Sequence, residues 1–178
     1  MRCFVAVWPN PEVLSALAAL PRPAMEGLRW SGPDQWHVTL RFFGEVDDRA
    51  LHAATRALAA TAARLPAPAQ AVGGPSTRFL GTGLVIWPVE GLGDAAMAVE
   101  RATKRIGKPP AARRFVGHVT LARAKPNVDL RPTRHLLTPL AISWPIDSLT
   151  LVQSSLHPDG ARYRVLEEFR MGRQGAGA

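Results

Sequence analysis

The chain has 178 residues, of which 47% are hydrophobic and 20% are charged, and its formal net charge is +8. This balance is typical of a globular protein with a buried core, and no apolar run approaches the roughly 20 residues of a membrane helix. The single cysteine, Cys3, excludes an intrachain disulfide and a zinc cluster built from cysteines, so we expect a cytoplasmic protein with no membrane association.

The first half of the chain alternates between strand and helix patterns. Its apolar periodicity predicts, in order, a strand over Arg2–Val7, a helix over Glu12–Leu20, a short strand over Leu28–Trp30, a turn at Ser31–Asp34, a strand over Trp36–Phe43 closed by Gly44, and a helix from about Arg49 to Arg64. Either Asp47 or Asp48 can cap the second helix, because a carboxylate accepts from the free amides of the first turn.

The second half repeats this alternation and then adds strands. It predicts a strand over Ala69–Val72, a strand over Leu84–Val89, a helix over about Ala95–Ile106, a strand over Phe115–Ala122, and closing strands over Ala141–Ile146, Ser148–Leu156 and Tyr163–Phe169. The segment Val128–Leu137 is ambiguous and is compatible with a short helix.

The repeated order of elements indicates a duplicated unit. We therefore expect an α+β fold that is bilobal, with a pseudo-two-fold duplication: mainly antiparallel sheets lining a central groove, and helices outside. No linker separates independent units, so one domain is predicted over residues 1–171, and residues 172–178 are predicted to be a disordered tail.

One tetrapeptide occurs twice, as His37-Val38-Thr39-Leu40 and as His118-Val119-Thr120-Leu121, nearly half the chain apart. Each copy sits in an apolar, β-branched run, and alternate side chains of a strand share a face. Histidine and threonine should therefore project together, while valine and leucine point into a core. Two half-buried histidines with satisfied hydrogen bonds would explain one copy, but the matching pair favours a functional site.

Basic residues surround the second copy. The segment from Arg101 to Arg134 holds ten of them and one acid, Asp129, and the sequence pI is near 11.1. A solvated cationic surface is one explanation. The position around His118 favours the other, a rim that attracts a polyanion.

Two histidines that face one substrate suit an in-line displacement at phosphorus. One imidazole removes a proton from the attacking water and the other protonates the departing oxygen, and a pKa near 6.5 makes both protonation states accessible. The threonine hydroxyls can donate to the non-bridging phosphate oxygens. This scheme requires neither a metal nor a cofactor, and no carboxylate occupies equivalent positions in both copies as a third metal ligand.

The paired motifs resemble those of the 2H phosphoesterase superfamily, and within it the RNA 2′,3′-cyclic phosphodiesterase (2′-5′ RNA ligase) family. The similarity spans almost the whole chain. It is carried by Arg2–Val7, His37–Val46, Phe115–Arg123 and Leu149–Phe169.

The resemblance implies a metal-free hydrolase that opens 2′,3′-cyclic phosphate ends of RNA to 2′-phosphates, with reversible 2′-5′ ligation of tRNA halves. It implies His37 as proton donor and His118 as proton acceptor, although the pseudo-symmetry allows the reverse order. In this family an arginine at the position of Arg123 holds phosphate. Phe42 occupies the equivalent place after the first motif, where it can stack on a base or pack in the core. The implied partner is RNA, and a monomer is expected.

Strict strand alternation conflicts with part of this assignment. It places Arg123 and Phe42 on the faces opposite the two histidines, and Arg41 on the same face as His37. A bulge or strand end near Gly44 and Ala124 would reconcile the two. Otherwise Arg41 becomes the better phosphate contact.

Other functions remain open at this point. A related phosphodiesterase could act on small cyclic nucleotides or ADP-ribose cyclic phosphate, and an RNA-binding module could use the groove without catalysis. Residues outside the motifs are expected to have structural or surface positions: His52, His135 and His157 at the surface, and Trp8, Trp30, Trp36, Trp87 and Trp144 in the core or groove wall.

Overall fold

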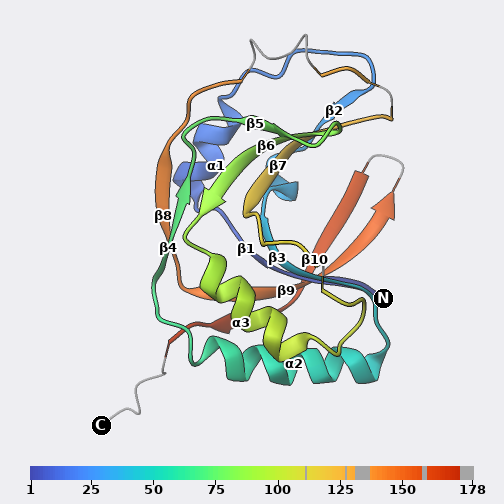
Figure 1. Cartoon of the computed structure of the whole chain (residues 1–178), viewed down its shortest axis with the longest axis vertical. Coiled ribbons are helices and arrows are strands. Elements are labelled where there is room, and N and C mark those ends of the chain that lie inside the picture. The colour runs from blue at the N-terminus through green and yellow to red at the C-terminus, as the bar shows by residue number, and fades with distance from the viewer. Residues whose placement is uncertain (111, 127, 131–136, 158–159, 173–178) are drawn as a thin grey trace.

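Ten strands and three α-helices form the described part of the chain, which comprises residues 1–110, 112–126, 128–130, 137–157 and 160–172 of a computed structural model (Figure 1). The helices are α1 (Pro11–Ala18), α2 (Asp48–Ala62) and α3 (Gly93–Thr103), and a 3-10 turn covers Pro33–Gln35. The strands are β1 (Arg2–Val7), β2 (Leu28–Trp30), β3 (Val38–Glu45), β4 (Ala69–Gly73), β5 (Arg78–Leu80), β6 (Leu84–Glu90), β7 (His118–Ala124), β8 (Ile142–Ile146), β9 (Ser148–His157) and β10 (Gly160–Arg170).

The strands pair in the order β10-β9-β1-β3-β7-β6-β4-β8, with β2 beside β7 and β5 beside β6. All of these pairings are antiparallel. The predicted α+β class with a mainly antiparallel sheet is therefore confirmed. The two strands that carry the repeated tetrapeptide, β3 and β7, are neighbours at the middle of this order.

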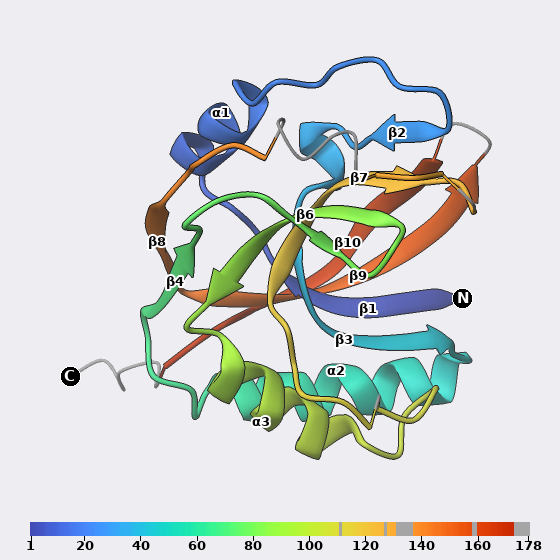
Figure 2. The same cartoon turned by 45° about the horizontal axis from the view of Figure 1, so that its top comes forward.

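Strands β3 and β7 meet at one pair of residues, Val38 and Val119, which occupy equivalent positions in the two tetrapeptides. When equivalent residues pair in an antiparallel ladder, a local two-fold axis passes between them. His37 and His118 directly precede these valines and so lie on either side of that axis. The sequence repeat is thus a spatial repeat at the centre of the sheet (Figure 2).

Most element bounds agree with the sequence predictions to within three residues. Of the two candidate caps of α2, Asp47 is the N-cap, and its carboxylate accepts from the amide of Ala50 at 2.7 Å. Strand β7 begins only at His118, whereas the prediction started it at Phe115. The partner of His118 in β6 is Pro88, which has no N–H to extend the ladder.

The remaining differences fall in short or undescribed segments. Strand β5 was not predicted from the sequence. The ambiguous segment Val128–Leu137 has no regular structure over residues 128–130, and residues 131–136 lie outside the described part. Most of the predicted tail, residues 173–178, also lies outside it.

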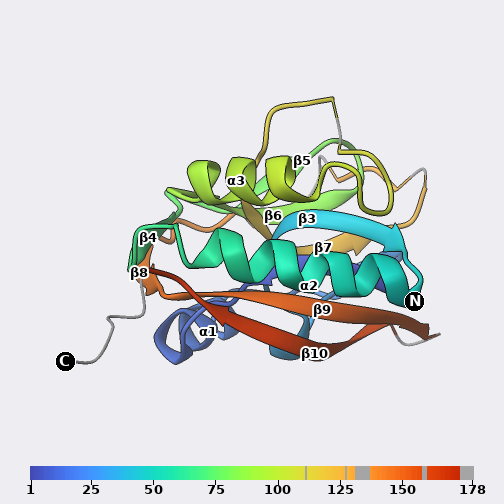
Figure 3. The ribbon, with the colours of Figure 1, turned by 90° about the horizontal axis from the view of Figure 1, so that it is seen from below.

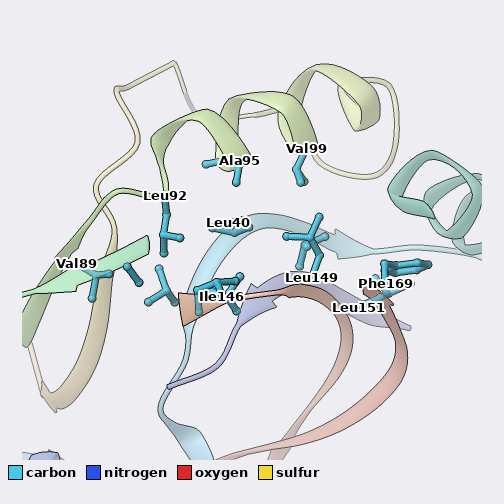
Figure 4. Close-up of a cluster of buried hydrophobic side chains, with 14 of the residues drawn as sticks. Leu40, Val89, Leu92, Ala95, Val99, Ile146, Leu149, Leu151 and Phe169 are labelled. Carbon is cyan, nitrogen blue, oxygen red and sulfur yellow. The ribbon is translucent and has the colours of Figure 1, made fainter. Parts of the chain in front are cut away.

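The helices cover the sheet from outside. Helices α2 and α3 run side by side, and α1 lies at the opposite end of the molecule (Figures 1 and 3). Figure 4 shows Leu92, the N-cap of α3, and Ala95 and Val99 of the helix facing Leu40 and Leu149 of the strands. Leu40 of the first motif is thus buried in the core, as its strand pattern predicted. None of the helices formed by the described residues has the length and apolarity to cross a membrane.

Candidate active site

Strand β3 contains a β-bulge at Leu40. Consecutive residues of β1 pair with Thr39 and Arg41, so Leu40 is an extra residue in the ladder. A bulge shifts the alternation of side chains by one residue. Phe42 therefore lines the same pocket as His37 and Thr39, and the expectation from strict alternation is wrong here.

Strand β7 contains the equivalent bulge at Leu121. Consecutive residues of β6 pair with Thr120 and Ala122 and leave Leu121 unmatched. Arg123 consequently joins His118 and Thr120 on the pocket face. The bulges that reconcile the family resemblance with the strand geometry thus lie within the two tetrapeptides, upstream of Gly44 and Ala124.

The pocket between the motifs has a volume of about 270 Å³. This volume is close to the lower end of the range for small-ligand sites, so it offers room for a nucleotide end group. The six residues singled out from the sequence all line it. Its lining is His37, Thr39, Phe42, His118, Thr120 and Arg123, together with Arg2, Phe4, Arg29, Ser31, Gln35, Ser154, Ala161 and Tyr163.

Both imidazoles are held in the same way. The Nδ1 atom of His37 lies 2.9 Å from the carbonyl oxygen of Gln35, and that of His118 lies 2.7 Å from the carbonyl oxygen of Val116. A carbonyl can only accept, so each Nδ1 carries the proton and donates. Each Nε2 is therefore the atom that gains or loses a proton. In His37 it lies 3.0 Å from the hydroxyl of Thr39.

Aromatic rings enclose His37. The ring of Phe4 stacks on the imidazole at 4.7 Å, Tyr163 meets it edge-on at 5.0 Å, and Trp8 lies at 5.5 Å between centroids. Burial lowers the pKa of His37 to about 4; the hydrogen bond to Gln35 opposes this shift, and the positive charges nearby add to it. At neutral pH the free pocket therefore holds a neutral His37.

His118 has a more open environment but the same direction of shift. Burial lowers its pKa, the hydrogen bond to Val116 opposes this, and the charges of Arg123, Arg113 and Arg78 add to the decrease. Two arginines of the basic segment around the second motif, Arg113 and Arg123, therefore lower the pKa of His118. An anion in the pocket would be attracted by the same charges and would raise the pKa values of both histidines.

Arg41 does not reach the pocket. Its side chain is buried, donates to the backbone carbonyls of Phe42, Ile106 and Lys108, and lies over the ring of Phe43 at 5.4 Å. It therefore ties β3 to the segment that follows α3. The alternative that Arg41 contacts phosphate is wrong, because the bulge turns it to the helix-covered side.

We expect Arg41→Met to lower the free energy of unfolding by about 3 kcal/mol, because buried carbonyls lose a charged donor. Urea denaturation measures this change. Arg49→Met is the matched control, since Arg49 is exposed on α2, and it should change the value by less than about 0.5 kcal/mol. Equal stabilities of the two variants would contradict the role given to Arg41.

Sequence reasoning missed several pocket residues. Phe4 and Tyr163 come from β1 and β10, far from the motifs in sequence, and Arg29 and Gln35 come from β2 and the 3-10 turn. No local pattern marks such positions, because only the pairing of distant strands brings them to the motifs. The available signal was that Phe4 and Tyr163 fall within Arg2–Val7 and Leu149–Phe169, two of the stretches that carry the family resemblance.

Other candidates from the sequence lie outside the pocket. His52 and His157 are exposed, as expected, and His135 lies outside the described residues. Trp36, Trp87 and Trp144 are buried, and Trp8 and Trp30 are partly buried. A separate apolar hollow beside β2 has a volume of only about 20 Å³, enough for one water. The described residues form no cluster of three or more His, Cys, Asp or Glu side chains suited to a metal ion.

Comparison with known proteins gives consistent matches. The family model described as the 2′-5′ RNA ligase superfamily matches residues 22–158. A relative from Thermus thermophilus named RNA 2′,3′-cyclic phosphodiesterase is 30% identical, and the match covers 96% of this chain and 90% of the relative.

Solved structures share the fold over nearly the whole chain. The crystal structure of TT0787 of Thermus thermophilus is 31% identical with a TM-score of 0.78, and the match covers 98% of this chain and 100% of that one. The crystal structure of E. coli LigT complexed with 3′-AMP is 25% identical with a TM-score of 0.72, and covers 96% of this chain and 97% of that one.

Proposed function

Because the chain belongs to the 2′-5′ RNA ligase superfamily, we propose that it hydrolyses the 2′,3′-cyclic phosphate at the 3′ end of RNA to a 2′-phosphate. The observation that carries this proposal is the pair of histidines. Each is fixed through Nδ1 and lines one shared pocket, on either side of a local two-fold axis. A phosphorus atom between them has a proton acceptor on one flank and a proton donor on the other.

The reaction is an in-line displacement. The Nε2 atom of His118 takes a proton from water, and the water oxygen bonds to phosphorus as the bond to the 3′ oxygen breaks. The Nε2–H of His37 gives its proton to that leaving oxygen, which becomes a 3′ hydroxyl. His37 is neutral in the free pocket, and the bound anionic phosphate raises its pKa so that it can carry the proton.

The other pocket residues hold the substrate. Thr39 and Thr120 occupy equivalent places beside the histidines and donate to the non-bridging oxygens. Arg123 is exposed in the pocket, where its guanidinium can neutralise phosphate. Phe42 is half-buried at the position equivalent to Arg123, where its ring can stack on the terminal base.

RNA is the proposed partner for three reasons. The Thermus relative is named an RNA 2′,3′-cyclic phosphodiesterase, and the LigT structure holds 3′-AMP, a ribonucleotide with phosphate at its 3′ position. The cationic pocket and the net charge of +8 favour a polyanion. Reversible 2′-5′ ligation of tRNA halves by a cytoplasmic monomer is the further proposal that follows from the family.

End-group analysis of the product tests the proposal. A short RNA with a 2′,3′-cyclic phosphate end is incubated with the protein in EDTA, and the position of the phosphate on the untreated product is mapped by NMR. We expect a 2′-phosphate next to a 3′ hydroxyl. A 3′-phosphate product would reverse the regiochemistry, and RNA that binds without turnover would indicate a binding module instead.

The pH dependence of kcat/KM should reflect the pKa values of the two histidines in the free protein. Activity rises with pH as the base loses its proton and falls as the acid loses its proton. Both pKa values lie below the ordinary 6.5, so the optimum of kcat/KM is expected on the acid side of pH 6.5. Rates at subsaturating substrate between pH 4 and 9 measure it. An optimum above pH 7.5 would contradict the burial of the two imidazoles.

A further inference from the structure

Arg29 lies directly opposite Arg123 where β2 pairs with β7. Both side chains are exposed, and both line the pocket that holds the two histidines. Like charges directly opposite each other in an antiparallel pair destabilise a sheet. Repulsion between the two guanidiniums therefore destabilises the free protein. An anion bound between them would be attracted by both and would offset this repulsion.

In the part of the chain that the structure describes, no carboxylate forms an ion pair with Arg29 or Arg123. The ion pairs formed there join the N-terminal amine to Glu45 and Arg170 to Asp147, and neither includes Arg29 or Arg123. The described residues that line the pocket include arginines but no Asp or Glu. Both guanidiniums thus keep their donors available for a ligand.

The backbone around Arg29 fixes its position. Strand β2 is joined to β7 next to the motif, because the amide of Ser31 donates to the carbonyl of Leu121 at 2.8 Å. On its other side the guanidinium packs on Gly160 at the start of β10, where an added Cβ would lie 2.9 Å from Nη2. Arg29 is therefore held at the wall of the pocket between β7 and β10.

The two ends of the pocket differ in chemistry. Phe42 and Arg123 occupy equivalent positions after the two motifs, so they lie on opposite sides of the local two-fold axis. The Phe42 side also holds Arg2, whose guanidinium lies over the Phe42 ring at 4.8 Å. One side thus presents an aromatic ring with a single guanidinium over it, and the other presents two adjacent guanidiniums.

We propose that Arg29, beside Arg123, forms a second phosphate subsite: Arg29 binds the 5′ phosphate of the terminal nucleotide while Arg123 and the two histidines hold its cyclic phosphate. This inference rests on the proposed function and specifies its substrate. In a nucleotide the base and the 5′ phosphate leave the ribose in different directions, as Phe42 and Arg29 require. The preferred substrate is therefore an RNA end that carries a phosphate on the 5′ side of the terminal nucleoside.

Three substrates separate the contributions: a nucleoside 2′,3′-cyclic phosphate with a free 5′ hydroxyl, the same nucleoside with a 5′ phosphate, and a dinucleotide with the cyclic end. In the wild-type protein, kcat/KM should rise with the second phosphate. In Arg29→Gln, the ratio of kcat/KM for the dinucleotide to kcat/KM for the unphosphorylated nucleoside should fall about tenfold.

The matched control is Arg162→Gln. Arg162 is exposed on β10, on the strand face opposite the pocket residue Tyr163, and its removal changes the net charge equally. This control should keep the wild-type ratio. The salt dependence gives a second readout, because loss of one phosphate contact to single-stranded RNA should lower the slope of log kcat/KM against log salt by about 0.7 in Arg29→Gln alone.

The outcomes separate the subsite from the proposed function. An Arg29→Gln ratio equal to wild type would overturn the subsite, as would a loss seen with the dinucleotide but not with the 5′-phosphorylated nucleoside. If the wild type hydrolyses none of the three, the proposed function fails. In that case, dissociation constants are measured for a dinucleotide with a 2′-phosphate end and for a nucleoside 2′-phosphate. The subsite predicts that the preference for the dinucleotide is smaller in Arg29→Gln than in the wild type, and an equal preference would overturn it.

Discussion

His37→Ala and His118→Ala are each expected to lower kcat/KM on RNA with a cyclic phosphate end by about 10³-fold or more. Each variant removes one proton-transfer group, which contributes about 10²–10⁴-fold, and also empties part of the phosphate site. Both rings line the pocket, so their removal leaves the main core unchanged. Initial rates measured in EDTA, beside circular dichroism and thermal unfolding, give the effect on catalysis apart from the effect on folding.

His52→Ala is the control for these variants. His52 is exposed on α2, away from the pocket, and its loss should leave kcat/KM within about twofold of wild type. The double variant His37→Ala/His118→Ala should lose little more than either single variant, because groups that act in one step are not additive. A single variant that keeps a third of the wild-type rate would remove its histidine from the proposed reaction.

Arg123→Gln is expected to lower kcat/KM by about 10²-fold, because a charged donor to the developing phosphate charge is lost. The same change should raise the pKa values of both histidines. The charge of Arg123 contributes to lowering each of them in the free pocket, and glutamine carries none. Kinetics and histidine titration by NMR therefore test one residue in two independent ways.

Arg49→Gln supplies the control for Arg123→Gln. It removes one exposed charge from α2, far from the pocket, so neither kcat/KM nor the histidine pKa values should move. Arg123→Lys should recover part of the rate, since a lysine restores charge without the paired donors of a guanidinium. Unchanged histidine titration in Arg123→Gln would place its charge outside the site.

The centre of the fold could be predicted because its signals are local. The repeated tetrapeptide alternates apolar and polar residues, so it indicated two strands with Val38 and Val119 in the core, and both are fully buried. The family assignment that these motifs suggested is confirmed by the match over residues 22–158. The fold also agrees with that of the solved structures that are similar in sequence.

The face of the sheet to which the side chains after each motif point could not be predicted in the same way. Bulges at Leu40 and Leu121 depend on ladders with β1 and β6, and those pairings are not encoded near the motifs. Without the bulges, strict alternation would place Arg41, and not Arg123, on the face that carries the histidines. The shared bulges also explain why equivalent positions carry Phe42 and Arg123 on one pocket face.

The low pKa of His37 could not be predicted from the local sequence either. Its low pKa arises from burial among aromatic rings, and these rings come from β1 and β10 at the two ends of the chain. The same holds for the opposition of Arg29 and Arg123. The motifs identify the reacting groups, and the surrounding strands set the charge state of those groups.

The most direct test of the account is a titration of both histidines with a nucleotide phosphate. Nitrogen-15 NMR would follow the Nε2 signals of His37 and His118 as adenosine 2′-monophosphate is added, with 3′-AMP as the isomeric control. If both imidazoles address one phosphate, both Nε2 signals move together with a single dissociation constant, and both pKa values rise in the complex. A response from one histidine alone would contradict the shared site.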